Sequence, residues 1–260
     1  MLKRKLDALA AQTLPVDVFE LVLCLNGCGQ DVRRLVEASD FGFGVTLLEF
    51  TQPRPVSSAR NACARMAKGA TLYFSDDDCL PAAETLELHL NAQRKRPCAA
   101  IGSIQFEERD HIDTWAPARV GYWNLNGANT SVPRRQFEEV GGFDETLTDY
   151  GGEDVLLGYR LAKSGLPQSA LPYATTRHLG PQPRRSRDTV KAVSAGRNAV
   201  KIARLHPELA WRLGVHPLSL LAKRIALGRT WRRLWRRLDA AAYDYERAYL
   251  EGALEEQQNA

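Results

Sequence analysis

The chain has 260 residues, 44% of them hydrophobic and 25% charged, which is the composition of an ordinary globular protein. Its formal net charge of +4 is too small to indicate nucleic acid binding by itself. No apolar run approaches the roughly 20 residues needed to span a bilayer, and the first residues lack the apolar core of a signal peptide. The five cysteines lack paired spacing, so a cytoplasmic protein with reduced thiols is expected.

The first part of the chain alternates between helical and strand-like patterns. Leu2, Leu6 and Leu9 have helical spacing, so the chain is expected to begin inside a helix. Further helices are predicted at residues 31–39, 57–68 and 81–95, and apolar runs predict strands at residues 18–25, 44–50, 70–75 and 98–106. This alternation predicts an α/β fold with a doubly wound, mostly parallel sheet flanked by helices.

The alternation of predicted helices and strands ends after about residue 107. Residues 108–133 read as a long loop rich in aromatic side chains, and loops of this length are usually functional. Trp115, Tyr122 and Trp123 are its candidates for stacking on a substrate, with simple packing as the alternative. The whole chain is expected to form two domains, an α/β domain over residues 1–185 and a basic helical extension over residues 186–260.

Three consecutive aspartates, Asp76, Asp77 and Asp78, end a predicted core strand in "TLYFSDDDCLP". Alternation along an extended segment would place Asp76 and Asp78 on one face, where two carboxylates repel unless a cation lies between them. Divalent cations prefer carboxylate oxygens and often bridge to phosphates, so we expect a metal site for a diphosphate. The alternative is that Asp78 caps a helix beginning at Pro81 and the other two are solvated.

A second acidic pair, Glu153 and Asp154, follows Gly151 and Gly152 in "YGGEDVLLGYRLAKSG". The pair falls in the first turn of a predicted helix, whose N-terminus stabilises anions. Burial in a closed cleft would make one of the two a workable base. Acidic residues are common in first turns, but a double glycine is less common and lets a ligand approach the backbone closely.

Five segments in order carry a family resemblance: "LDALAAQTLP", "ELVLCLNGCGQD", "SSARNACARMAKGATLYFSDDDCLP", "NGANTSVPRRQFEEVGGFDE" and "YGGEDVLLGYRLAKSG". Together they resemble the family 2 glycosyltransferases with the GT-A fold, over residues 2–178. The last two also look like the carboxyl half of galactosyltransferase-type enzymes. The resemblance implies a GT-A domain, here followed by a C-terminal helical extension.

The resemblance also implies roles for individual residues. Asp78 would bind Mn²⁺ or Mg²⁺, Asp76 would face the metal or the ribose, and His178 would be a third ligand unless it is structural. Asp154 would be the catalytic base, with Glu153 as the second choice. The donor would be held by a set of residues near the nucleotide and its sugar, although Arg60 and Asn61 could equally be helix surface: Asn26, Arg60, Asn61, Asp76, Asp77 and Asn129.

The implied activity is an inverting transfer of a hexose from a nucleotide-diphosphate sugar, with UDP favoured, to a hydroxyl of a glycan, lipid-linked or small-molecule acceptor, as in cell-envelope polysaccharide synthesis. Family members begin with a nucleotide-binding strand, whereas this chain begins inside the helix that follows it. Asn26 also stands where an acidic residue is frequent. We favour a miscalled start, with a degenerate, non-catalytic protein that binds nucleotide sugars or a partner as the alternative hypothesis.

The carboxyl-terminal region is basic. Residues 209–238 contain eight Lys and Arg residues and no Asp or Glu. An apolar stripe at helical spacing opposes the arginines, and consists of Leu227, Trp231, Leu234, Trp235 and Leu238. One hypothesis is a peripheral anchor on the anionic inner face of a membrane, and the other is a helix packed on the catalytic domain. No groove-reading motif supports nucleic acid.

Overall fold

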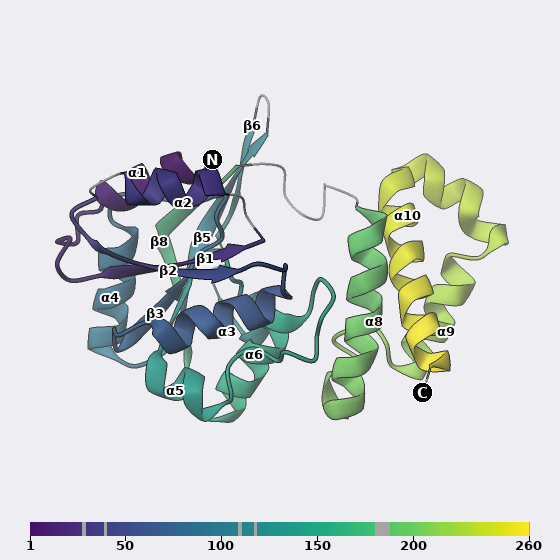
Figure 1. Ribbon diagram of the computed structural model, residues 1–260. Helices are drawn as coiled ribbons and strands as arrows, with labels where there is room; N and C mark the ends of the chain where they lie inside the picture. Colours follow the sequence, from purple (N-terminus) through teal and green to yellow (C-terminus); the bar gives the residue numbers. More distant parts are fainter. Residues whose placement is uncertain (28–29, 39–40, 109–110, 117–118, 180–187, 260) are drawn as a thin grey trace. The chain divides into compact units, whose positions relative to one another are not determined.

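The computed structural model describes residues 1–27, 30–38, 41–108, 111–116, 119–179 and 188–259, without the side chains of residues 30, 107, 108, 111–113, 115 and 229–236 (Figure 1). The chain divides into two compact units. The first comprises Met1–Glu145 and Asp154–Pro181, and the second comprises Thr146–Glu153 and Gln182–Ala260. The domain boundary predicted between residues 185 and 186 lies outside the described residues.

The first unit opens with α1 (Leu2–Ala10), as its leucine spacing predicts. The strands β1 (Glu20–Asn26) and β2 (Gly44–Phe50) pair in parallel, with Leu23 opposite Leu47, and α2 (Gln30–Glu37) lies between them in sequence. The helix α3 (Val56–Met66) follows and contacts β1. Figure 1 shows β1 and β2 side by side.

The main sheet of this unit has six strands: five lie in the order β3-β7-β5-β8-β4, and the sixth, β6, pairs with β5 off this path. Only β5 and β8 run parallel in it, so the expectation of a mostly parallel sheet is wrong in this detail. Parallel neighbours need a crossover helix, whereas β6 and β7 return directly from the long segment after β5. The strand bounds are Thr71–Phe74 (β3), Cys79–Pro81 (β4), Ala99–Glu108 (β5), His111–Trp115 (β6), Thr130–Pro133 (β7) and Gln168–His178 (β8).

Pro81 marks a local error of the sequence prediction. It does not begin a helix, because it pairs with Thr176 as the last residue of β4. The helix α4 (Thr85–Lys95) starts four residues later, where the Thr85 hydroxyl donates to the Thr175 carbonyl at 2.7 Å. Two more helices, α5 (Arg134–Glu139) and α6 (Glu153–Lys163), complete the unit. A core cluster joins the sheet to them through side chains such as Phe74, Ile101, Val132, Phe143 and Leu157.

The second unit is helical, with α8 (Thr189–Leu205), the 3₁₀ turn η2 (Pro207–Leu209), α9 (Pro217–Ala226) and α10 (Arg229–Gln258). Figure 1 shows α10 beside α8. They pack closely because glycines lie at the contact: a Cβ on Gly196 would fall 2.1 Å from the Tyr249 carbonyl oxygen, and one on Gly252 would fall 2.0 Å from that of Val193.

The helix α10 is interrupted at Asp239, which has φ −156° and ψ 96°. The Asp239 carboxylate accepts hydrogen bonds from the N–H groups of Ala241 and Ala242, so it caps a new helical start. Of the predicted apolar stripe, Leu238 is 73% exposed and Leu227 is partly buried in the core of this unit. The side chains of Trp231, Leu234 and Trp235 lie outside the described residues. Among the described residues, no helix combines the length and apolarity that crossing a membrane demands.

Candidate active site

The three aspartates lie in a turn, not in an extended strand. The strand β3 ends at Phe74, and the Cys79 N–H donates to the Asp76 carbonyl at 3.2 Å. Strand alternation therefore does not apply, and the expectation of Asp76 and Asp78 on one face of a strand is wrong. Their side chains meet different partners, and that of Asp77 is exposed.

Arg60 of α3 joins the two acidic segments. Its guanidinium donates to Asp76 Oδ1 at 2.7 Å and to Asp154 Oδ1 at 3.2 Å, and its side chain is only 15% exposed. Arg60 is therefore not a simple surface residue of its helix. The Gly127 N–H donates to Asp154 Oδ2 at 3.0 Å, and a Cβ on Gly127 would lie 2.0 Å from Arg60 Nη2. The structure thus brings Asp76 and Asp154 within reach of one guanidinium.

Asp78 forms a second cluster with His178. The residues Cys79 and His178 are paired across β4 and β8, and His178 Nε2 lies 3.3 Å from Asp78 Oδ2. Donor atoms of Asp78, Cys79 and His178 all lie within 4.8 Å of one another. Burial raises the pKa of the Cys79 thiol well above its usual range, so it stays protonated and is a poor ligand. His178 Nδ1 is buried without a hydrogen-bond partner among the described residues. An imidazole and a carboxylate so placed fit a divalent cation.

Lys5 is a site residue that the sequence reasoning missed. It is 6% exposed, and its ammonium donates to the Ser75 hydroxyl and to the carbonyl oxygens of Asp76 and Cys79 beneath the aspartate turn. Burial lowers the pKa of Lys5 to about 8. The available signal was its position, because residue 5 falls on the same helical face as the buried Leu6 and Leu9.

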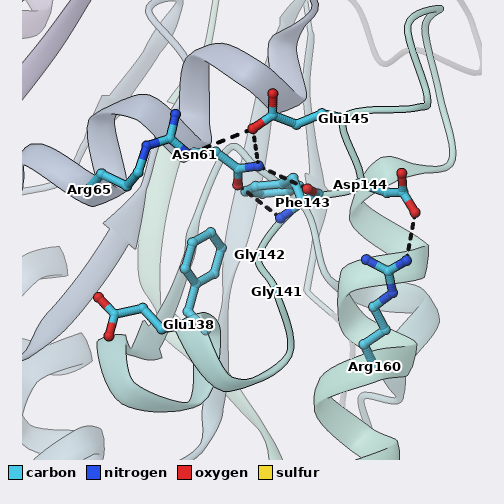
Figure 2. A pocket seen from close by; sticks show the side chains of 10 residues that line it. Asn61, Arg65, Glu138, Gly141, Gly142, Phe143, Asp144, Glu145 and Arg160 are labelled. Carbon is cyan, nitrogen blue, oxygen red and sulfur yellow. Dashed lines mark hydrogen bonds and ion pairs between the residues drawn. The ribbon is translucent and has the colours of Figure 1, made fainter.

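Asn61 has a structural role, and its expected contact with the nucleotide stays a prediction. It is 6% exposed, donates to the Phe143 carbonyl and to Glu145 Oε1 at 2.9 Å each, and accepts from the Phe143 N–H at 2.9 Å. Figure 2 shows this clamp and the ion pair between Arg160 and Asp144, 2.6 Å long, on the other side of the loop. Asn61 thus fixes the "GGFDE" loop, which borders an open cavity of about 420 Å³.

Asn129 is likewise a core residue. It is fully buried, donates to the carbonyls of Ser103 and Ala174, and accepts from the Tyr73 hydroxyl at 3.0 Å. Its Oδ1 also lies 2.9 Å from Nε2 of the buried His89. These bonds occupy the amide, so the expectation that Asn129 contacts the donor sugar is wrong. It supports the strand that follows Gly127.

Asn26, expected to read the nucleotide base, lies at the end of β1. Its amide exchanges two hydrogen bonds of 2.8 Å with the backbone N–H and carbonyl of Arg54. It therefore fixes the segment between β2 and α3. Its role toward a base stays a prediction.

The aromatic candidates lie in different settings. Trp123 is 44% exposed, in the 3₁₀ turn η1 (Tyr122–Asn124). Tyr122 packs edge-on against Trp123 and Tyr159, with centroid distances of 5.1 Å and 5.6 Å. Trp123 therefore has surface to offer a ligand, while Tyr122 is engaged in packing. The side chain of Trp115 lies outside the described residues.

The double glycine before the second acidic pair is explained by backbone conformation and packing. Gly151 and Gly152 have φ of +96° and +94°, which glycine adopts readily. A Cβ on Gly152 would lie 2.7 Å from Ile202 Cδ1 of α8. The buried Asn198, also on α8, donates to the carbonyls of Gly151 and Asp149 at 2.8 Å and 3.0 Å. The second unit therefore shapes the loop that leads into α6.

The acidic pair itself is divided by accessibility. Glu153 is 7% exposed, whereas the side chain of Asp154 is 24% exposed. Asp154 is therefore the better placed of the two to meet a substrate.

Comparisons with known proteins agree with this fold. The sequence profile of glycosyl transferase family 2 matches residues 1–148. Validoxylamine A glucosyltransferase of Streptomyces hygroscopicus subsp. jinggangensis (strain 5008) is 28% identical over 213 residues, which cover 65% of this chain and 50% of the relative. The chain thus spans about half the length of that relative.

Solved structures show the same fold. The mannosyltransferase PcManGT from Pyrobaculum calidifontis, in complex with GDP-Man and Mn²⁺, matches with a TM-score of 0.64 and 21% identity over 99% of this chain and 83% of its own. Staphylococcus aureus TarS 1-349, in complex with UDP-GlcNAc, matches with a TM-score of 0.61 and 14% identity over 99% of this chain and 88% of its own.

The fold places the chain in the GT-A structural class. Within that class, the chain belongs to glycosyl transferase family 2.

Proposed function

We propose that this protein is a metal-dependent, inverting hexosyltransferase that uses a nucleotide-diphosphate sugar. The observation that carries the proposal is the placement of Arg60, whose guanidinium contacts both Asp76 and Asp154. The segment expected to bind the diphosphate and the expected base therefore contact the same arginine side chain. This is the geometry that a displacement at an anomeric carbon requires, with the leaving group and the base at one site.

Asp78 and His178 would hold a divalent cation, Mn²⁺ or Mg²⁺. Their donor atoms are close together, and the buried His178 Nδ1 lacks a partner among the described residues. A bound cation neutralises charge on the leaving diphosphate. Arg60 adds a fixed positive charge beside Asp76, and Lys5 holds the backbone of the turn from below. Asp76 and Asp77 belong to the donor side in this proposal.

Asp154 would act as the general base. Its carboxylate is oriented by Arg60 and by the Gly127 N–H. It takes the proton of an acceptor hydroxyl as that oxygen bonds to the anomeric carbon. The bond from that carbon to the diphosphate breaks on the opposite face, and the electron pair leaves with the phosphate oxygen. The sugar therefore changes anomeric configuration.

The substrate class follows from relatives and remains broad. Structurally similar proteins were solved with GDP-Man, UDP or UDP-GlcNAc, which supports a nucleotide sugar as the donor, and UDP is our choice from the sequence. The acceptor is a hydroxyl of a glycan, a lipid-linked or a small molecule. We place the reaction in the cytoplasm, in the synthesis of a cell-envelope polysaccharide.

The test compares the wild type with Asp154→Asn in Mn²⁺ buffer against a panel of nucleotide sugars, by nucleotide release and by calorimetric binding. We expect the variant to lose at least about 100-fold in turnover, because the base is gone, and to keep donor affinity. Asp7→Asn, an exposed change of the same kind on α1, is the control and should retain wild-type turnover. Normal turnover by Asp154→Asn refutes the assignment. A wild type that binds a donor but never turns over supports a non-catalytic binding protein instead.

A further inference from the structure

The helix α9 exposes an apolar face. Leu218, Leu221 and Ile225 are 59%, 53% and 61% exposed, and their spacing places them on one side of the helix. Leu220, on another side, is 3% exposed and belongs to the core of the second unit. Leu220 therefore anchors the helix in the core, while three large aliphatic side chains are exposed. Adjacent exposed aliphatic residues on one helix usually mark a binding surface.

An exposed tryptophan lies at the beginning of this helix. Trp211 is 60% exposed, and its ring stacks on His216, the N-cap of α9, at 3.9 Å between centroids. Tryptophan rings favour the boundary between water and the acyl chains of a bilayer. The ring therefore extends the apolar face with a group suited to a membrane interface.

The sequence of this helix and its flanks is basic. Residues 209–238 contain eight Lys and Arg residues and no Asp or Glu. Arg212 and Arg224 are exposed next to the apolar residues in sequence, and Lys223 pairs with Glu246 of α10. An apolar helix face within a basic segment complements an anionic lipid surface in both its hydrophobic and its electrostatic terms.

We propose that the α9 face, defined as Trp211, Leu218, Leu221 and Ile225, docks the protein on an anionic lipid bilayer. Leu218, Leu221 and Ile225 enter the boundary of the acyl chains, and Arg212 and Arg224 meet the lipid phosphates. This surface differs from the stripe predicted between Leu227 and Leu238, because Leu221 and Ile225 fall off that stripe. The inference does not depend on the proposed transfer reaction.

The test is flotation of the full chain with phosphatidylcholine vesicles, with and without phosphatidylglycerol. We expect binding only to the anionic vesicles, weakening as salt rises. The variant Leu218→Ser, Leu221→Ser, Ile225→Ser should bind at least about tenfold more weakly, since it removes three inserting side chains. Val190→Ser, Leu205→Ser is the matched control, because these α8 residues are 75% and 58% exposed, and it should float like the wild type.

Two results would overturn the proposal: a wild type that stays with neither vesicle, or a triple variant that floats as well as the control. Circular dichroism melting checks that the variants remain folded. Sedimentation analysis tests whether the face instead joins two copies of the chain. In that case the wild type would form a concentration-dependent dimer that the triple variant does not form, and it would not bind vesicles. Arg212→Gln, Arg224→Gln should lower binding to anionic vesicles while leaving the melting curve unchanged.

Discussion

The two acidic segments of the site are held in place by different means. The turn at Asp76–Asp78 is fixed by cationic side chains of its own unit, Lys5 from below and Arg60 from the side. The loop before Asp154 is fixed by neutral contacts with α8, through Asn198 and the space left by Gly152. The side expected to bind the charged donor thus depends on charge, and the side expected to hold the base depends on packing against the helical extension.

The largest effect should come from removing the proposed metal ligand of the turn. Asp78→Asn keeps the size of the side chain but weakens its affinity for a hard cation. We expect transfer to fall by at least about 100-fold and Mn²⁺ binding, followed by calorimetry, to become undetectable. Asp77→Asn is the comparison within the same turn: Asp77 is exposed and assigned to the donor side, so this variant should keep Mn²⁺ binding. Equal losses in both variants would mean that the turn contributes only negative charge.

The difference between the two acidic segments is tested by substituting Lys5 and Asn198 separately. Lys5→Met leaves the turn carbonyls of Asp76 and Cys79 without their donor, so donor affinity should fall, seen as a raised KM. Asn198→Ala frees the carbonyls of Gly151 and Asp149, so kcat should fall while KM changes little. The KM of the Lys5 variant and the kcat of the Asn198 variant should each change about tenfold. Each variant should also lose about 1–3 kcal/mol of unfolding free energy. The same kinetic pattern in both variants would contradict separate roles.

The sequence predicted most of the frame and part of the site. The apolar runs placed β1, β2, β3 and β5, because buried strands impose a clear local pattern. It could not show that Pro81 pairs with Thr176, or that Asp76 and Asp78 lie in a turn, because these depend on a strand nearly 100 residues away. Asn61 and Asn129 illustrate the same limit. A buried amide bonded to backbone looks, in sequence, like an amide that binds a ligand.

The contact of Asn198 with Gly151, in the loop before Asp154, was equally hidden, since the two residues lie 47 positions apart. Lys5 is the opposite case. Its place on the buried face of an amphipathic helix was visible in the spacing, and a lysine at such a position calls for oxygen partners inside the fold.

The smallest effect at neutral pH concerns the buried His89 and its partners Asn129 and Ser131. His89 lies against Asn129 and Ser131, each at 2.9 Å, in the strand that follows the Asp154 partner Gly127. Burial lowers the pKa of His89 to about 4, from an ordinary value of 6.5. The imidazole is therefore neutral when folded at pH 6, whereas the unfolded chain binds a proton there. Because the unfolded state binds more protons, the unfolding free energy must fall as pH decreases from 6.5 toward 4.

The shift corresponds to a loss of about 3 kcal/mol across that range, and no change is expected above pH 7.5. Urea unfolding at a series of pH values measures it. His89→Gln is the reference variant, because glutamine retains an amide that can bond Asn129 and does not titrate. The wild type should lose stability relative to this variant only below pH 6.5. If the unfolding free energies of the two proteins fell in parallel with pH, the acid sensitivity would come from the carboxylates and His89 would contribute nothing to it.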